Sequence, residues 1–408
     1  MTLPLGSSAS GSSASGTSAS GTSAPQRLAA RWEERVMRAA HPIAYPVLRM
    51  ARGPVLRVPG LGVLVRDAAL LRSTLLNTTS FTKIGPGSPA DLWTDVLGPS
   101  VLLNMEGADH QALRRKLAPI FAPSFVEPMV AESLGEPVAQ LRERLSSGEQ
   151  VDLVEEVRRY SSIAISRLVG LDSAELTTDL FRKVSSITSM VRLSQAKLTS
   201  TQVARARVVM GELGSHAQSA YRVGDERTVP GRMRTLGLTE SEAMGAVGAF
   251  VLTGTETLVS YIPRLVCLLI DSGWLPLIAA ERSLVEPAIA EALRVTTPSP
   301  VMLRSVMAAG RIGPVAVRVG DRVILATFAA NRALGPFDPE ANTAATLRQL
   351  WFGAGSHFCL GAPLAMAQIR LVCDAILLAA PQGDLRVISR RPARGVLIPS
   401  YATVVIGT

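Results

Sequence analysis

The segment from Phe352 to Gly361 constrains this chain more than any other, because it surrounds a single cysteine with glycine. It reads FGAGSHFCLG, and its one cysteine is Cys359. Glycine permits backbone conformations and close approaches that other residues do not. A helical pattern over 362–378 begins directly after the segment, so Cys359 lies near a helix N-terminus, where the dipole and free amide groups favour a thiolate. The loop therefore predicts a nucleophilic or metal-binding thiolate.

Several roles for this cysteine can be compared from the sequence. A lone free cysteine is most often a buried structural residue. A zinc site is disfavoured, because no second cysteine or histidine pair has finger-like spacing. A nucleophile would need a base, and His357 lies two residues away. A glycine-rich approach to one thiolate fits a haem with a single cysteine ligand better than these. The other two cysteines, Cys267 and Cys373, are expected in the core, and so odd and sparse a count favours a reducing, intracellular location.

At every fixed position this segment resembles the haem-binding signature of the cytochrome P450 superfamily, Phe-Gly-x-Gly-x-His-x-Cys-x-Gly. The resemblance spans roughly residues 27–408 and implies a haem b cofactor with Cys359 as the iron ligand. It implies that His357 reaches a haem propionate and that Phe352 packs beside the sulfur. The other cofactor-binding positions that it implies within the loop are Gly353 and Gly361.

Two residue pairs match the same family in the expected order. His110 and Arg114 are spaced i, i+4 and share a helix face. Alone they would suggest an ordinary basic amphipathic helix, but the resemblance implies that they bind a propionate, as does Arg304. Glu291 and Arg294, spaced i, i+3, would alone suggest a surface ion pair of little worth. The resemblance implies a buried structural pair behind the cysteine loop.

The apolar stretch 244–270 is long enough to cross a membrane. Glu256 lies in its middle, and a charge there costs a few kcal/mol at least, so we expect a long buried helix and no membrane span. Gly254 and the threonine hydroxyls beside it predict a kink. A polar patch satisfied by the backbone is the plain alternative. The resemblance implies that Glu256 and Thr257 are the catalytic pair that delivers protons for oxygen activation.

The resemblance also places the substrate between this helix, the loop before His110 and the segment after Arg294. Apart from Glu256, no charged side chain is expected along these walls. Apolar walls with a few hydroxyls favour a small, neutral, lipophilic substrate, and a threonine hydroxyl could bind one of its oxygens. The predicted lining residues are Ala249, Leu252, Thr253, Pro300, Val301 and Met302.

Periodicity along the chain predicts one large, mainly helical unit with small sheets. The resemblance implies the mainly helical cytochrome P450 fold with a small β region. The chain has 408 residues, of which 47% are hydrophobic. Residues 1–25 repeat GSSAS-like pentapeptides and are predicted to be a disordered Gly/Ser/Ala/Thr-rich tail, with a single domain over 26–408. The net charge of +9 comes from scattered arginines without a nucleic-acid signature, so no nucleic-acid partner is expected. The expected strands cover 55–58, 63–65, 315–319, 322–326, 385–388 and 401–406.

The expected function is that of a cytoplasmic haem-thiolate monooxygenase that uses dioxygen to hydroxylate or epoxidise its substrate. Because the chain has no Walker loop and no convincing dinucleotide fingerprint, we expect electrons from a ferredoxin-type donor with its reductase. Arg115, Lys116 and Arg370 would steer an acidic donor to the cysteine side. The alternatives are a peroxide-driven or redox-neutral haem enzyme, and a non-catalytic haem protein that docks on a partner enzyme.

Three positions depart from the family pattern. Thr253 stands where a small residue is usual, and Gln349 replaces a common histidine. The segment 338–342 reads DPEAN and lacks the arginine expected there. The last two departures concern the segment that leads into the cysteine loop.

Overall fold

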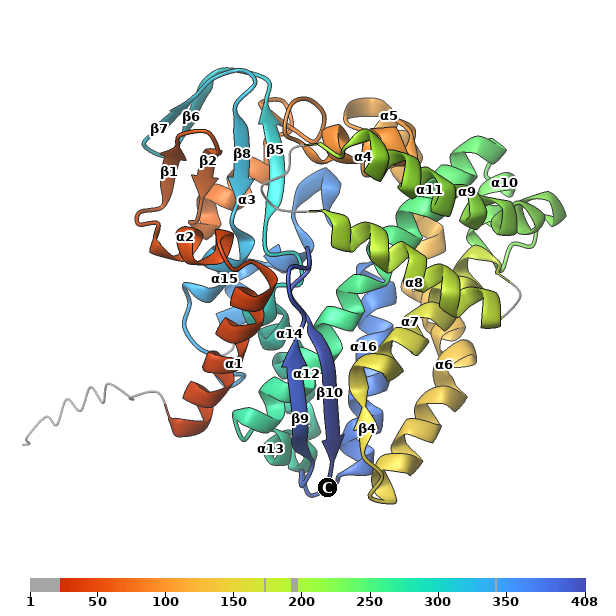
Figure 1. Ribbon diagram of the computed structural model, residues 1–408, viewed down its shortest axis with the longest axis vertical. Coiled ribbons are helices and arrows are strands. Elements are labelled where there is room, and N and C mark those ends of the chain that lie inside the picture. The colour runs from red at the N-terminus through yellow and green to blue at the C-terminus, as the bar shows by residue number, and fades with distance from the viewer. Residues whose placement is uncertain (1–22, 172–173, 192–196, 342) are drawn as a thin grey trace, which may run out of the picture.

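Helices make up most of the molecule, and a small sheet region lies at the upper left of Figure 1. The computed structural model describes residues 23–171, 174–191, 197–341 and 343–408. In chain order the helices are α1 (Ala24–Ala40), α2 (Ala44–Met50), α3 (Ala68–Leu76), α4 (Pro89–Leu97), α5 (Gly107–Leu117), α6 (Pro123–Ser146), α7 (Leu153–Val169), α8 (Ala174–Met190), α9 (Ser200–Val223), α10 (Val229–Thr235), α11 (Glu240–Gly254), α12 (Glu256–Asp271), α13 (Leu275–Ala280), α14 (Val285–Thr296), α15 (Thr327–Arg332) and α16 (Ala362–Ala379). The mainly helical class expected from the sequence is confirmed.

Short strands form a five-stranded sheet in the order β1-β2-β8-β5-β3, a three-stranded sheet in the order β4-β10-β9, and a β6-β7 hairpin. In the five-stranded sheet, β2 and β8 are parallel and the other neighbours are antiparallel. The strands are β1 (Val55–Val58), β2 (Gly62–Val65), β3 (Phe81–Thr82), β4 (Val151–Asp152), β5 (Met302–Val306), β6 (Gly310–Ile312), β7 (Val315–Val317), β8 (Arg322–Leu325), β9 (Arg386–Pro392) and β10 (Tyr401–Gly407). Each of the six expected strands corresponds to one of these, although β9 continues four residues further than expected.

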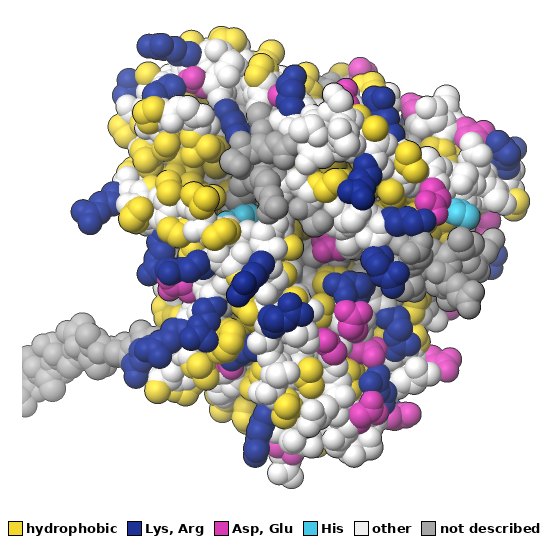
Figure 2. Space-filling model, viewed as in Figure 1, with side chains coloured by type: hydrophobic (Ala, Val, Ile, Leu, Met, Phe, Trp, Pro, Cys, Tyr) yellow, Lys and Arg dark blue, Asp and Glu magenta, His cyan; other side chains and the backbone are white. Residues whose placement is uncertain are grey.

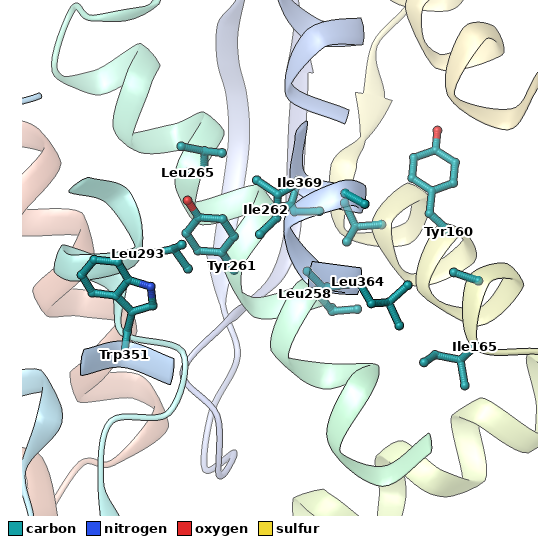
Figure 3. Close-up of a cluster of buried hydrophobic side chains, with 14 of the residues drawn as sticks. Tyr160, Ile165, Leu258, Tyr261, Ile262, Leu265, Leu293, Trp351, Leu364 and Ile369 are labelled. Atoms are coloured by element: carbon teal, nitrogen blue, oxygen red, sulfur yellow. The ribbon is translucent and has the colours of Figure 1, made fainter. Parts of the chain in front are cut away.

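The core is built around α12, which is buried from Leu258 to Leu269, including the polar residues Ser260 and Arg264. It packs against α7, α14 and α16, and α6 packs along α16. Figure 3 shows side chains of α12 and α16 in the middle of this cluster, with Leu293 and Trp351 at one end and Tyr160 and Ile165 of α7 at the other. Trp351 directly precedes the cysteine loop, so the start of that loop is anchored in the core.

The single helix expected over 244–270 is corrected to two helices that meet at Thr255. Gly254, at the break, lets α7 approach closely, because a side chain there would meet Ile165 Cδ1 at 2.9 Å. The Thr255 hydroxyl donates to the carbonyl of Val251 at 3.1 Å, as the sequence argument for a kink requires.

Two helical stretches, Glu240–Asp271 and α16, are long and apolar enough to cross a membrane. Within the fold, 61% and 56% of their most apolar windows are buried. Core helices of globular proteins pass the same test of length and composition, so it is weak evidence for a span.

The predicted tail lies, over residues 1–22, outside the described residues. Ser23 caps α1, and Ala24 and Pro25 already belong to that helix.

A buried ion cluster joins the first helix to the core. Glu33 of α1 accepts hydrogen bonds from Arg264 of α12, with Nε to Oε1 at 3.1 Å, and from Arg332 of α15 at 3.0 Å. Glu33 and Arg264 are 3% and 0% exposed. Arg264 also donates to the carbonyls of Thr296 and Pro399, so its guanidinium is fully bound.

Removing the charge of Glu33 should therefore be costly. Glu33→Gln leaves Arg264 buried without its counter-ion, which typically costs about 3–5 kcal/mol. The neighbouring Glu34→Gln is the matched control, because Glu34 pairs with exposed Arg38 and Arg49, and such pairs are worth less than about 1 kcal/mol. Urea unfolding measures both, and equal losses in the two variants would contradict the role of the buried cluster.

Candidate active site

The cysteine loop folds back on itself through short hydrogen bonds. The N–H of Cys359 donates to the carbonyl of Phe352 at 2.8 Å, and the N–H of Gly353 donates to that of Leu350 at 2.9 Å. Gly353 has φ +84°, a conformation in which other residues are strained. The side chain of Met302 in β5 lies next to Gly353. The loop therefore holds a fixed turn that presents Cys359 just before α16.

The Cys359 side chain is exposed to solvent, although protein surrounds it at longer range. This surrounding protein raises the pKa of the thiol. Backbone N–H groups of Gly361 and Ala362 and the charges of Arg114 and Lys83 act in the opposite direction. No side chain occupies the space beside Gly361, where an added Cβ would meet nothing within 4 Å. The two other cysteines are buried, as expected.

Four predicted residues gather on one side of this loop. His110 is buried in α5, and its ring lies 4.1 Å from that of His357, centroid to centroid. Arg114, one turn further along α5, donates to the carbonyl of Phe358 at 2.7 Å. Arg304 of β5 is 4% exposed. Burial lowers the pKa of His110 to about 4 and that of Arg304 to about 10.

Two members of this cluster were missed from the sequence, Glu106 and Lys83. Glu106 precedes α5 and binds His357 Nε2, the N–H of Lys83 at 2.7 Å and the hydroxyl of Thr82 at 3.1 Å. Burial alone would raise the pKa of Glu106, but these bonds lower it to about 2. The spacing Glu106-x-x-x-His110 is the only sequence signal that could have indicated it.

Lys83 follows β3 directly and carries no recognisable motif. Its surroundings, chiefly burial and then the charge of Arg304, lower its pKa to about 7. The charges of Glu106, Arg114 and Cys359 also act on it, which places its ammonium within the cluster. Among the described residues, its ammonium has neither a hydrogen bond nor an ion pair.

The predicted pair Glu291 and Arg294 is fully buried in α14. Arg294 Nε donates to Glu291 at 2.8 Å, and the same guanidinium donates to the carbonyls of Asn331 and Pro336. Glu291 accepts from the N–H of Asp338 at 3.1 Å. Together they hold the segment that leads toward the cysteine loop.

This leading segment is also where the sequence departs from the family pattern. Arg348 and Gln349 both adopt positive φ, +47° and +56°. Asn342 lies outside the described residues. A hollow of about 470 Å³ lies here, lined by Ala290, Ala344, Ala345, Arg348, Gln349 and Trp351.

The predicted acid–alcohol pair lies at the start of α12. The hydroxyl of Thr257 donates to the carbonyl of Thr253 at 3.2 Å, and the hydroxyl of Thr253 donates to that of Ala249 at 2.7 Å. Glu256 accepts a hydrogen bond from the hydroxyl of Ser185 in α8. The Glu256 carboxylate borders a cavity of about 350 Å³, whose polar lining includes Arg158, Arg182, Ser185, Ser186, Thr188, Ser400 and Tyr401.

The residues predicted to line a substrate pocket differ in solvent exposure. Thr253 is exposed and Met302 half-buried beside the cysteine loop. Ala249 and Leu252 are buried, and Leu252 is only 3% exposed within the main core. Pro300 is buried, and Val301 packs on a second apolar cluster that includes Tyr45 and Phe328.

Comparisons with known proteins identify the class of this fold and site. The solved structure of P450BioI in complex with a hexadecenoic-acid-ligated acyl carrier protein superposes with a TM-score of 0.76, covering 92% of this chain and 99% of that one at 19% identity. A mutant of P450 EryK in complex with erythromycin B gives a TM-score of 0.75 over 91% and 97% at 21% identity. The fold is therefore that of the cytochromes P450.

Sequence comparison gives the family itself. Cytochrome P450 107B1 of Saccharopolyspora erythraea is 30% identical over 71% of this chain and 74% of its own length. Mycinamicin IV hydroxylase/epoxidase of Micromonospora griseorubida is 28% identical over 69% and 72%. No family model matches the chain. The chain belongs to the cytochrome P450 superfamily and is an oxidoreductase, a P450 monooxygenase, for which the family implies a haem cofactor.

The residues present fit such a cofactor. The cluster beside Cys359 holds the guanidinium groups of Arg114 and Arg304 and the ammonium of Lys83 against one carboxylate, that of Glu106. Buried Arg304 Nε, a hydrogen-bond donor, has no partner among the described residues. Buried polar groups are normally satisfied, so this arrangement suits an anionic group next to the cysteine.

Proposed function

We propose that this protein hydroxylates or epoxidises a small lipophilic molecule with dioxygen, as a haem-thiolate monooxygenase. The observation that carries the proposal is an exposed cysteine at a helix N-terminus next to a buried, unbalanced group of cations. A thiol in that position suits an iron ligand, and the cations suit the carboxylates of a porphyrin.

In this proposal the cofactor is haem b, and Cys359 is its iron ligand. His110, Arg114, Arg304 and His357 bind the propionates, Phe352 packs beside the sulfur, and Gly353 and Gly361 let the porphyrin approach the backbone. When bound, the haem supplies the activation of dioxygen. Glu291 and Arg294 position the loop rather than touch the cofactor.

The ligand assignment has a spectroscopic test. Cys359→Ser removes the thiolate and should abolish the carbon monoxide spectrum characteristic of thiolate-ligated reduced haem. Cys373→Ser is the matched control, since Cys373 is a buried cysteine of α16 away from the loop, and it should keep the spectrum. A normal spectrum in Cys359→Ser would refute the assignment.

Charge balance adds Lys83 to the proposed propionate-binding residues. With Lys83 protonated, Lys83, Arg114 and Arg304 carry three positive charges and Glu106 carries one negative charge, while the lowered pKa values of His110 and His357 keep both rings neutral at neutral pH. The net charge of the cluster is then +2. Two propionates carry −2, so Lys83 is the cation that makes the buried site neutral, since Glu106 cancels one guanidinium.

The Lys83 assignment predicts effects of opposite sign with and without haem. In the haem-free protein the pKa of Lys83 falls from 10.5 when unfolded to about 7 when folded. This shift destabilises the folded state; the full effect is present below about pH 7 and it disappears above pH 10.5. Lys83→Met should therefore raise the unfolding midpoint of the haem-free protein, more at about pH 6 than at about pH 9. In the haem-loaded protein it should lower the midpoint and speed haem loss to an acceptor protein.

Lys116→Met is the control, because Lys116 is exposed on α5 and should change neither quantity. If Lys83→Met loses haem at the parent rate, Lys83 does not bind a propionate. The assignment of Cys359 as the iron ligand would still stand.

We also propose that protons reach the reaction through Glu256 and Thr257. The cavity beside Glu256 is rich in hydroxyl groups, which suits ordered water. Glu256 would take protons from this side and pass them to the hydroxyl of Thr257. Within the described part of the chain, the hydroxyl of Thr257 has one hydrogen bond, which it donates to the carbonyl of Thr253 at 3.2 Å, so its oxygen can still accept a hydrogen bond.

The proton route predicts a specific defect. Thr257→Val should keep haem and substrate binding, but product formed per electron should fall by roughly a hundredfold or more, with the electrons diverted to peroxide. Thr253→Val is the matched control, because it removes an equivalent hydroxyl one turn earlier and should weaken substrate affinity more than coupling. Product yield per electron at the parent level in Thr257→Val would contradict the route.

The proposed substrate is neutral and lipophilic because the predicted lining residues that are exposed or half-buried, Thr253, Val301 and Met302, carry no charge. The hydroxyl proton of Thr253 is already donated to Ala249, so toward a substrate its oxygen acts as an acceptor.

For electrons we propose a ferredoxin-type donor with its reductase, in the cytoplasm, docking near exposed Arg115 and Lys116. Arg370 is less suited than expected, because Glu286 binds it through two hydrogen bonds. Turnover that needs no reductase would favour the peroxide-driven alternative.

A further inference from the structure

Helix α2 is apolar on its outer face as well as on its inner one. Its inner residues Tyr45 and Leu48 pack into the second apolar cluster. On the outer face, Val47 and Met50 are 48% and 73% exposed, and Ile43, directly before the helix, is 80% exposed. Their spacing of four and three residues aligns them in one row along the helix. We call this row the α2 stripe.

The stripe lies in a larger apolar area of the surface. Figure 2 shows hydrophobic side chains gathered where Figure 1 draws α2 and the first two strands, with Lys and Arg side chains beside them. Monomeric proteins expose single apolar side chains routinely, but a contiguous row rimmed by charge marks a contact surface.

The charge around the stripe is strongly positive. Between Ser23 and Arg66 the sequence holds eight arginines and two glutamates, a net charge of +6, and one of these arginines, Arg57, is paired with Asp321 of a later segment. One of these glutamates, Glu33, is buried in the ion cluster of the core. The other, Glu34, is shared by Arg38 and Arg49, which remain 62% and 56% exposed.

Further cations complete the rim. Arg52 directly follows α2 and is exposed, and no side chain of the described part of the chain pairs with it. Arg66 donates to the carbonyl of Ala51 at the end of the same helix. Protruding apolar side chains with arginines beside them are complementary to a partner that has an apolar interior and an anionic outer layer.

We propose that α2 is a peripheral docking surface for an anionic phospholipid bilayer. The α2 stripe enters the headgroup region, and the surrounding guanidinium groups bind lipid phosphates. A second copy of this chain fits less well, because it would bring two arginine-rich surfaces together. The proposal does not depend on the haem chemistry, since it concerns a different face and a different ligand.

Vesicle co-sedimentation of the haem-loaded full-length protein tests the proposal. Binding should occur to vesicles of phosphatidylcholine with phosphatidylglycerol, should be much weaker on pure phosphatidylcholine, and should fall as salt rises. Combined Ile43→Ser, Val47→Ser and Met50→Ser should weaken binding by at least about tenfold, since the apolar insertion is lost.

The matched control is Val208→Ser with Val223→Ser, two similarly exposed valines of α9 that should leave binding unchanged. Should the stripe variant fold poorly, Arg38→Gln with Arg52→Gln supplies an independent test through the charge, with the same expected direction. Vesicle binding that is equal in the parent and the stripe variant overturns the proposal. So does a parent that ignores the vesicles and instead forms a dimer that the stripe variant loses.

Discussion

Arg294 is the buried charge that joins helix α14 to the irregular segment leading toward the cysteine loop. Its guanidinium is fully buried, and burying a charge is tolerable only when every donor is bound. Glu291 neutralises it, and the carbonyls of Asn331, Gly335 and Pro336 take the remaining donors. A helix is thereby joined to an irregular segment that has little regular hydrogen bonding of its own. That segment continues along the chain toward the turn that presents Cys359.

The interior beside the loop shows a second electrostatic constraint. Lys83, Arg114 and Arg304 come from three distant parts of the chain, and each is costly to bury. A fold that concentrates cations in this way is stabilised by a dianion at that place. Glu106 belongs to the same group of charges. It binds the ring of His357, and its negative charge reduces the net positive charge that a ligand would neutralise.

Local motifs explain what the sequence could predict. The cysteine loop, the Glu291–Arg294 pair and the His110–Arg114 pair each lie within one short segment, so their spacing is visible in the chain, and the helical class and family were confirmed. Glu106 and Lys83 were missed because their roles arise only from contacts with residues such as His357, 251 positions further on. The break at Thr255 was expected as a kink but not as a helix end, since it depends on how closely α7 approaches Gly254. Strands such as β3, with two residues, are too short to show a period.

The buried ion cluster of α1 has a consequence for the order in which the chain can fold. Glu33 pairs with Arg264 and Arg332, which lie 231 and 299 residues later. The acidic residue is therefore synthesised long before either of its partners. Until they emerge, α1 has no place to dock and the apolar helices between them lack part of their cover. Contacts of such long range slow folding and expose apolar surface for longer. Helix α1 thus acts as a closing element of the fold, although it is synthesised well before α12 and α15.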